Sequence, residues 1–192
     1  MVERVKILGQ GYGASLNVIL VDENDRAIGL EEKMRAHTKG GKLHRAISVY
    51  IFNSKGQMMM QRRAKDKYHS GGLWSNTCCT NCYEGESAPQ SAHRSLKTEM
   101  GFDCNIEEVF KTIYKAELDR GMTEHEYLHV FFGVHEQAPN LNDMEAMDWK
   151  WMHLDQLLKD VQTHPNKYTA WLKILLKGEL PDRIREFTRS TK

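Results

Sequence analysis

Short apolar runs between clusters of turn residues divide the first half of the chain into strands. Residues 16–21 read as a strand, and the polar residues 22–25 end it. A second strand over residues 45–52 meets an Asn-Ser-Lys-Gly turn and returns over residues 57–63, which predicts a β-hairpin. The three consecutive methionines of the returning strand favour core positions over an adaptable binding surface.

The next pattern has a helical period. Ser87, followed three residues later by Gln90, has the spacing of a capping box. Apolar residues then recur at helical spacing up to Gly101, a residue type that commonly ends helices. We therefore expect one amphipathic helix that starts after Ser87 and stops at Gly101.

Strands return in the second half of the chain. Residues 109–118 and 124–134 are rich in β-formers and flank an Asp-Arg-Gly turn, and residues 148–152 read as a further short strand. Helical patterns over residues 155–163 and 168–177 close the chain. Strands with a few inserted helices and mostly hairpin-like connections predict an α+β fold.

Length and charge limit the classes of function. A chain of 192 residues that is 40% hydrophobic can bury one core, so we expect a single domain over residues 16–192 behind a flexible lead-in of residues 1–15. The 27 Lys and Arg balance 26 Asp and Glu, which argues against nucleic acid or anionic membranes as partners. The sequence shows no membrane-spanning apolar run and no secretory signal, so we expect a cytoplasmic monomer or homodimer.

The cysteines do not form the even framework of a secreted disulfide protein, so reduced thiols are expected. Cys79 and Cys82 form a C-x-x-C, which also fits a redox pair or half of a structural zinc site. A zinc site requires a second pair, and Cys78 with Cys104 lacks that spacing. The motif alone therefore makes a weak case for either function.

Two local patterns carry the candidate chemistry. Cys79 ends the run Trp-Ser-Asn-Thr-Cys-Cys, and Glu126 ends the run Glu-His-Glu that starts at Glu124. A thiol and a carboxylate on opposite sides of a small substrate can add one proton to carbon and remove another, which is isomerase chemistry. Glu124 and Glu126 are two residues apart, so on a strand they project from one face and can share a cation.

The predicted helix lies in a pattern that resembles a Nudix box. Glu86, Arg94 and Glu99 have its spacing, in which a loop and a helix present carboxylates to a divalent cation on a diphosphate. Ser95 and Thr98 stand where hydrolytic members carry glutamates that assemble metals and activate water. The pattern favours diphosphate binding over hydrolysis, and it implies a Nudix-like α/β/α sandwich with a mixed central sheet and one short Nudix-type helix.

Over residues 16–171 the chain resembles the type I isopentenyl-diphosphate isomerases, which are Nudix-fold enzymes. The matching segments occur in the family's order: Glu32-Lys33, His37, His44, Phe52-Asn53, residues 62–64, 74–79, 85–87, 99–101 and 124–126, and Trp171. The resemblance implies interconversion of isopentenyl and dimethylallyl diphosphate, an early step of isoprenoid biosynthesis. It further implies that Cys79 and Glu126 carry out an antarafacial 1,3-proton shift through a tertiary carbocation.

Protonation of an unactivated alkene creates a carbocation, which a dry site must stabilise without offering a nucleophile. The resemblance implies that Trp171 presents its π-face to this cation, an interaction worth about 2 kcal/mol or more when desolvated. Tyr114 matches a tyrosine whose hydroxyl helps the acid to deliver its proton. Taken alone, either aromatic side chain would more often be a core residue, so both assignments depend on the surrounding match.

The resemblance also implies a divalent metal centre. Its ligands match two histidines and two carboxylates, namely His37, His44, Glu124 and Glu126. Asn81 stands where the family has its third histidine, and its amide is a poorer ligand for a transition metal. The next residue, Cys82, is a candidate thiolate ligand instead. The metal could therefore be Mn²⁺, Zn²⁺ or Mg²⁺.

A second cation, Mg²⁺, is implied on Glu99 and the diphosphate of the substrate. The basic residues that match the family's diphosphate contacts are Lys33, Arg63, Lys67 and Arg94. Two alternatives stay open at this stage: a Nudix hydrolase of some diphosphate, and a catalytically silent diphosphate or metal binder. The hydrolase predicts phosphate release, whereas the silent binder predicts ligand binding without turnover.

Overall fold

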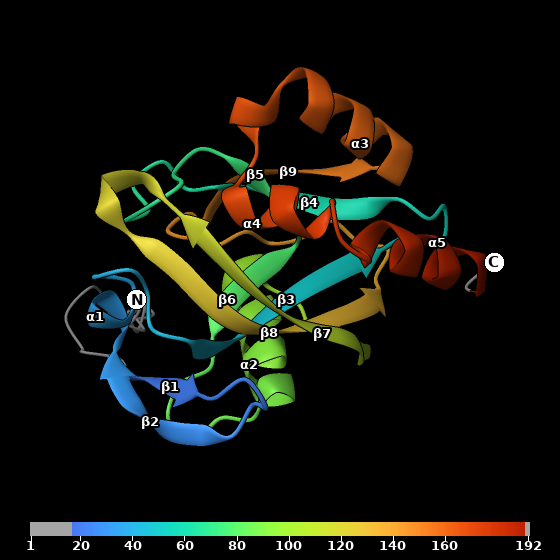
Figure 1. The fold of residues 1–192 in the computed structure, drawn as a ribbon. Helices are drawn as coiled ribbons and strands as arrows, with labels where there is room; N and C mark the ends of the chain where they lie inside the picture. Colours follow the sequence, from blue (N-terminus) through green and yellow to red (C-terminus); the bar gives the residue numbers. More distant parts are fainter. Residues whose placement is uncertain (1–16, 191–192) are drawn as a thin grey trace, which may run out of the picture.

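The computed structural model describes residues 17–190, and its strands form one mixed sheet (Figure 1). The strands are β1 (Asn17–Val21), β2 (Ala27–Glu32), β3 (His44–Phe52), β4 (Met58–Arg63), β5 (Trp74–Ser75), β6 (Cys78–Asn81), β7 (Ile106–Glu117), β8 (Thr123–Val134) and β9 (Ala146–Met152). The helices and helical turns are α1 (Lys33–Ala36), α2 (Ala88–Ser95), η1 (Leu96–Met100), η2 (Asp119–Gly121), α3 (Leu154–Thr163), η3 (Pro165–Lys167), α4 (Ala170–Leu175) and α5 (Leu180–Ser190). The predicted lead-in, residues 1–15, lies outside the described residues, and so does Leu16.

The central strand is β3, because it has hydrogen-bonded neighbours on both sides. It runs parallel to β8, in a register that places His44 opposite Glu126. It also pairs antiparallel with β6, which places Ser48 opposite Cys79. The topology therefore brings a histidine, a carboxylate and a thiol from three separate segments into one part of the sheet.

Alternate residues of β3 enter two hydrophobic cores, as the two-residue period of a strand requires. Tyr50 and Phe52 belong to the core that includes residues of α3, α4 and α5, whereas Ile47, Val49 and Ile51 belong to the core that includes residues of α2. Helices thus cover both faces of the sheet (Figure 1), which confirms the predicted α/β/α sandwich with a mixed sheet. Burial on both faces explains why β3 reads as a continuous apolar run.

The predicted hairpin of β3 and β4 forms only at its turn. Asn53 N donates to Gln57 O at 3.0 Å, and Gly56 takes the positive φ of 69° that the turn requires. Beyond the pair of Phe52 and Met58 the strands separate, because β3 pairs with β6 and β8 whereas β4 pairs with β5 and β9. The hairpin expectation is therefore corrected to a splayed pair of strands.

The methionine run of β4 is buried, as predicted. Met58 and Met60 belong to the core that includes α4, whereas Met59 belongs to the core that includes α2. None of the three is more than 1% exposed. The run therefore contributes to both cores and not to a binding surface.

The Nudix-type helix has the predicted ends. Gln90 N donates to Ser87 Oγ, and Ser87 N donates to Gln90 Oε1 at 2.8 Å, which completes the capping box. Gly101 ends the helix in the left-handed conformation, with a φ of 74°. Its last turn, η1, is π-helical, so the predicted single helix is α2 followed by a π-helical segment that contains Glu99. Such segments occur frequently at functional sites.

The chain ends differently from the sequence expectation. α3 and α4 correspond to the two predicted helices, but a further helix, α5, follows them. Its buried Leu180 and Ile184 are four residues apart and Pro181 lies in its first turn, so the sequence carries a helical signal there. The pattern also misses β2, β5, β6 and α1, most of which are too short to show a period. Within residues 17–190, no helix combines the length and the apolar character needed to cross a membrane.

Candidate active site and metal centre

A cavity of about 120 Å³ lies among residues of β4, β6, β7, β8, η1 and α4. The predicted site residues that line it are Lys33, His37, Arg63, Lys67, Cys79, Arg94, Glu99, Tyr114, Glu124, Glu126 and Trp171. His44 is outside this lining, and it is fully buried next to Glu126. Segments far apart in the sequence therefore converge on one cavity.

Cys79 lies on β6 at the wall of the cavity. Its Sγ is 3.1 Å from Asn76 Oδ1 and 3.4 Å from Ser48 Oγ. Burial raises the pKa of Cys79 to about 12. The side chain is therefore a protonated thiol at neutral pH, so it carries a proton and is a poor nucleophile.

A chain of buried hydrogen bonds links Cys79 to Trp171. The Asn76 amide nitrogen donates to backbone carbonyls of β3 and β6, both at 2.9 Å, which leaves Oδ1 as the acceptor for the Cys79 thiol. Ser75 Oγ donates to the same Oδ1 at 3.0 Å and accepts from Trp171 Nε1 at 2.9 Å. Asn76 is fully buried, so this network fixes the thiol and the indole relative to each other.

Tyr114 connects the two carboxylates of β8. Its hydroxyl lies 2.8 Å from Glu124 Oε2 and 2.7 Å from Glu126 Oε2. Burial raises the pKa of both glutamates, and the charge of Glu124 raises that of Glu126 further. One hydroxyl proton cannot serve two acceptors at once, so the pair of glutamates retains a proton unless a cation neutralises it.

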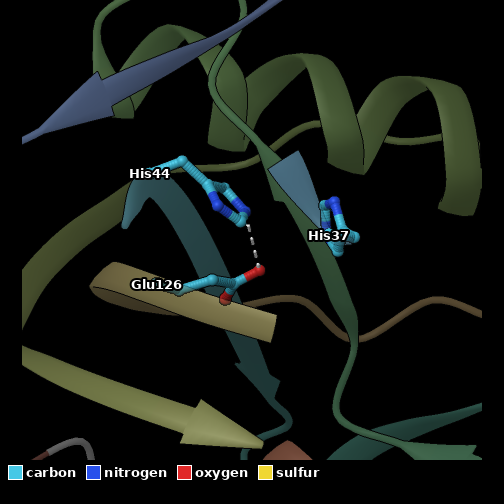
Figure 2. A group of neighbouring side chains, drawn as sticks. All are labelled: His37, His44 and Glu126. Carbon is cyan, nitrogen blue, oxygen red and sulfur yellow. Dashed lines mark ion pairs between the residues drawn. The ribbon is translucent and has the colours of Figure 1, made fainter. Parts of the chain in front are cut away.

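His37, His44 and Glu126 point toward one another (Figure 2), and their donor atoms lie within 4.8 Å of each other. The two Nδ1 atoms lie 2.7 Å from Lys33 O and 2.8 Å from Lys42 O, so they carry the ring protons and leave Nε2 able to ligate. His44 Nε2 is buried, has no hydrogen-bond partner among the described residues, and lies 3.8 Å from Glu126 Oε1. Burial lowers the pKa of both imidazoles, which keeps them neutral. These donors fit a divalent metal ion.

The two faces of β6 separate its side chains. Asn81 lies on the same side as Cys79, with Nδ2 3.4 Å from Glu126 Oε1. Cys78 and Cys82 are fully buried in the core around α2. Cys82 is therefore not a ligand of the metal group, and Cys79 and Cys82 are not a redox pair, because the two thiols lie on opposite faces of the sheet. Each of these cysteines is free.

Two of the predicted diphosphate contacts are paired with carboxylates. Lys67 Nζ lies 2.5 Å from Glu145 Oε2, and Arg94 Nε lies 2.6 Å from Glu86 Oε1. The second pair is the arginine and glutamate of the Nudix pattern. Both cations line the cavity, so each pair orients a positive charge at its wall.

The other two predicted contacts lie against aromatic rings. Lys33 Nζ is 5.1 Å from the centroid of the Tyr68 ring, and the Arg63 guanidinium is 5.1 Å from the centroid of the Trp171 ring. Arg63 is only 8% exposed. Neither cation forms an ion pair with a carboxylate in the described part of the chain, so both charges are available to an anion in the cavity.

Glu99 is held in place by two hydrogen bonds. Ser95 Oγ donates to it at 2.5 Å and Gln61 Nε2 at 3.3 Å. Burial raises the pKa of Glu99, and the neighbouring Glu145 adds to this effect. Ser95, at a position where Nudix hydrolases carry a glutamate, therefore orients the remaining carboxylate without adding a charge.

Sequence reasoning missed several contributors to the site. Ser75 and Asn76 belong to the same Trp-Ser-Asn-Thr-Cys-Cys run as Cys79, and their polar side chains next to a buried strand were a usable signal. His69 is 2% exposed and its Nε2 lies 3.6 Å from Glu124 Oε1. It belongs to a loop without hydrophobic period, so no local pattern identifies it.

Comparisons with known proteins agree with this geometry. Residues 42–172 match the family described as NUDIX domain. Isopentenyl-diphosphate Delta-isomerase 2 of Aromatoleum aromaticum is 49% identical over 159 residues, covering 83% of this chain and 84% of the relative. Isopentenyl-diphosphate Delta-isomerase of Pectobacterium atrosepticum is 45% identical over 170 residues, covering 88% of this chain and 94% of the relative.

Solved structures share the fold at low identity. A protein from Deinococcus radiodurans matches with a TM-score of 0.68 and 15% identity, covering 88% of this chain and 98% of that chain. The MutT protein from Methanosarcina mazei matches with a TM-score of 0.57 and 17% identity, covering 78% of this chain and 96% of that chain. These likenesses concern the fold, whereas the matches in sequence are specific: this chain belongs to the NUDIX domain family and, within it, to the isopentenyl-diphosphate Delta-isomerases.

Proposed function

We propose that this protein interconverts isopentenyl diphosphate and dimethylallyl diphosphate by a 1,3-proton shift. The observation that carries the proposal is the convergence on one cavity of a protonated thiol, Cys79, a carboxylate, Glu126, and an indole, Trp171. The names of the relatives supply the substrate. The proposal includes a cytoplasmic monomer or homodimer that needs neither nucleic acid nor membrane for turnover.

The cations at the cavity hold the diphosphate in this proposal. Lys33 and Arg63 are unpaired with carboxylates in the described residues and contact the phosphate oxygens directly, and Lys67 and Arg94 add charge at the wall. Glu99 would hold a Mg²⁺ ion shared with the diphosphate, because Mg²⁺ is commonly bound by one or two carboxylates plus substrate phosphates. Binding the charged end this way leaves the hydrocarbon end at Cys79.

Cys79 and Glu126 exchange protons with the hydrocarbon. One of them gives a proton to the terminal alkene carbon, the other removes a proton from the allylic carbon, and the double bond moves by one position. The same two residues work in reverse for the opposite direction, with their roles exchanged. The high pKa of the thiol keeps the proton on Cys79 until the alkene takes it up.

Trp171 and Tyr114 support the charge that develops between these steps. The indole is 3% exposed and fixed by Ser75, so it offers an aromatic surface to a cation without offering a nucleophile. Burial raises the pKa of the Tyr114 hydroxyl, which keeps it a neutral donor toward Glu126. Both side chains belong to the wall of the cavity.

The metal centre belongs to the proposal as well. His37, His44 and Glu126 would hold a divalent cation, Mn²⁺, Zn²⁺ or Mg²⁺, with Glu124 adjoining through Tyr114. When bound, the cation would neutralise the carboxylate pair and stabilise its charged form. Glu126 would then be held as a charged carboxylate, the form that accepts a proton.

A time course of purified protein with isopentenyl diphosphate and Mg²⁺, followed by proton and phosphorus NMR, tests the proposal. We expect dimethylallyl diphosphate to form without free phosphate. Release of phosphate would instead support a Nudix hydrolase, and an unchanged substrate with Mg²⁺, Mn²⁺ and Zn²⁺ in turn would leave a silent binder. A parallel sample of the Cys79→Ala variant shows whether conversion depends on the thiol.

A further inference from the structure

His69 places a third imidazole beside the metal group of His37, His44 and Glu126. It lies in the loop between β4 and β5 and is 2% exposed. Its ring centroid is 6.3 Å from that of His37, with the two rings stacked at 28°. Its Nε2 is 3.6 Å from Glu124 Oε1. The imidazole is therefore next to the metal group but comes from a separate segment.

The loop that carries His69 is held in place on several sides. Ser70 N donates to Asp119 Oδ1 at 2.9 Å, which ties the loop to the turn between β7 and β8. A Cβ atom on Gly71 would lie 2.3 Å from Lys65 O, so only glycine allows this packing of the loop. The edge of the Trp171 ring contacts the imidazole, with centroids 5.8 Å apart. His69 is therefore a fixed side chain and not a mobile one.

Within each of two histidine–glutamate pairs, the distance between the donor atoms permits a shared ion. Two ligands at about 2.0–2.2 Å from one cation are at most about 4.4 Å apart. His69 Nε2 is 3.6 Å from Glu124 Oε1, and His44 Nε2 is 3.8 Å from Glu126 Oε1. The Tyr114 hydroxyl contacts the Oε2 atoms of both carboxylates, which leaves each Oε1 turned toward a histidine. The two donor pairs are adjoining, because Tyr114 bridges their carboxylates.

Asn81 is a poor donor in this arrangement. Its amide nitrogen, at 3.4 Å, is the atom that faces Glu126 Oε1. An amide NH₂ has no lone pair to offer a metal, and the side chain is only 4% exposed. The position that holds a histidine in the resembled family therefore contributes a hydrogen-bond donor to Glu126 here.

We propose that His69 is the third histidine ligand of the metal centre, in the role that Asn81 leaves open. The donor atoms of His37, His44 and Glu126 already lie within 4.8 Å of one another, and His69 would join them together with Glu124, which it faces at 3.6 Å. The inference rests on the proposed function for the identity of the site, but it concerns metal binding alone. Three imidazoles with carboxylates favour Zn²⁺ or Mn²⁺ over Mg²⁺, which prefers oxygen ligands.

Zn²⁺ affinity of the full chain, measured by competition with a chromophoric chelator and without substrate, tests this proposal. We expect His69→Gln to weaken Zn²⁺ binding by about 10- to 100-fold or more. His164→Gln is the matched control and should bind as the unaltered protein does, since His164 is exposed elsewhere on the surface. In the double variant His69→Gln with Asn81→His, affinity should recover.

Pulsed EPR of bound Mn²⁺ in the unaltered protein counts coordinated imidazoles, and it needs no variant to fold. Three imidazoles are expected, and two would overturn the proposal. Unchanged affinity in His69→Gln, or an equal loss in His164→Gln, would overturn it too. Because no turnover is measured, a chain that binds Zn²⁺ through His69 but fails to isomerise would contradict the proposed function and leave this inference standing.

Discussion

The hydrogen-bond network around Asn76 makes a quantitative prediction for the Asn76→Ala variant. The amide is fully buried, donates to the backbone of β3 and β6 and accepts from Cys79 and Ser75. Its two N–H protons and its two accepted bonds are worth about 1 kcal/mol each, so the variant should lose about 4 kcal/mol of folding free energy. For a chain of this size, that corresponds to a Tm lower by roughly 8–16 °C.

The same variant should slow the chemistry. Without Asn76 Oδ1, the Cys79 thiol loses its shortest hydrogen bond, 3.1 Å, and the indole of Trp171 loses the anchor of its partner Ser75. If the loss of this hydrogen bond raises the activation free energy by about 1.4 kcal/mol, kcat falls roughly tenfold. KM should change little, because Asn76 contacts none of the basic residues in the cavity wall.

Thermal unfolding and steady-state kinetics, measured below the unfolding transition, are the assays. Asn24→Ala, which alters an exposed turn asparagine, is the matched control and should leave Tm and kcat unchanged. Ser75→Ala should give an intermediate loss, since it breaks the contact with Trp171 and keeps that between Asn76 and the thiol. A lower Tm with an unchanged kcat would show that Asn76 is structural only and would refute the reasoning.

Three further predictions concern the cavity and the thiols. Cys79→Ala should lower kcat by about 10²–10⁴-fold, which is the contribution of a general acid or base, whereas the control Cys104→Ala should leave kcat unchanged. Equal rates for Cys79→Ala and the unaltered protein would remove Cys79 from the mechanism. Trp171→Leu should lower kcat about 30-fold if a cation–π contact of about 2 kcal/mol is lost, and Trp171→Phe should lower it less. Burial raises the pKa of Cys78, Cys79 and Cys82, so their contribution to stability is complete below about pH 9, the pKa of an exposed thiol, and is lost as pH rises above it. Thermal unfolding should therefore show a Tm that falls between roughly pH 8.5 and 10.5. A Tm that does not change over this range would contradict the effect of burial on the thiols.

Features fixed by local chemistry were predictable from the sequence. The capping box at Ser87 and the glycine stop at Gly101 depend on hydrogen bonds within one turn, and both occur in the structure. The Met58–Met60 run is buried because strand residues alternate between two cores. The same alternation separates Cys82 from Cys79, but it became visible only with β6, a strand that the pattern missed.

Pairings between distant segments were not predictable. β3 has parallel contacts with β8, about eighty residues away, and these replace most of the expected hairpin. The convergence of Tyr114, Glu124 and Glu126 requires the β7 and β8 register, and no periodicity reports it. His69 belongs to a loop, so only the folded chain reveals its distance from Glu124.

Proton exchange with solvent is the most direct test of the central claim. Isopentenyl diphosphate is incubated with the protein in D₂O, and the product is analysed by NMR for deuterium at the carbon that becomes a methyl group. The account predicts dimethylallyl diphosphate that carries deuterium there, formed about 10²–10⁴-fold more slowly by the Cys79→Ala variant. Product without deuterium, or deuterated product from the Cys79→Ala variant at the same rate, would contradict a 1,3-proton shift that depends on Cys79.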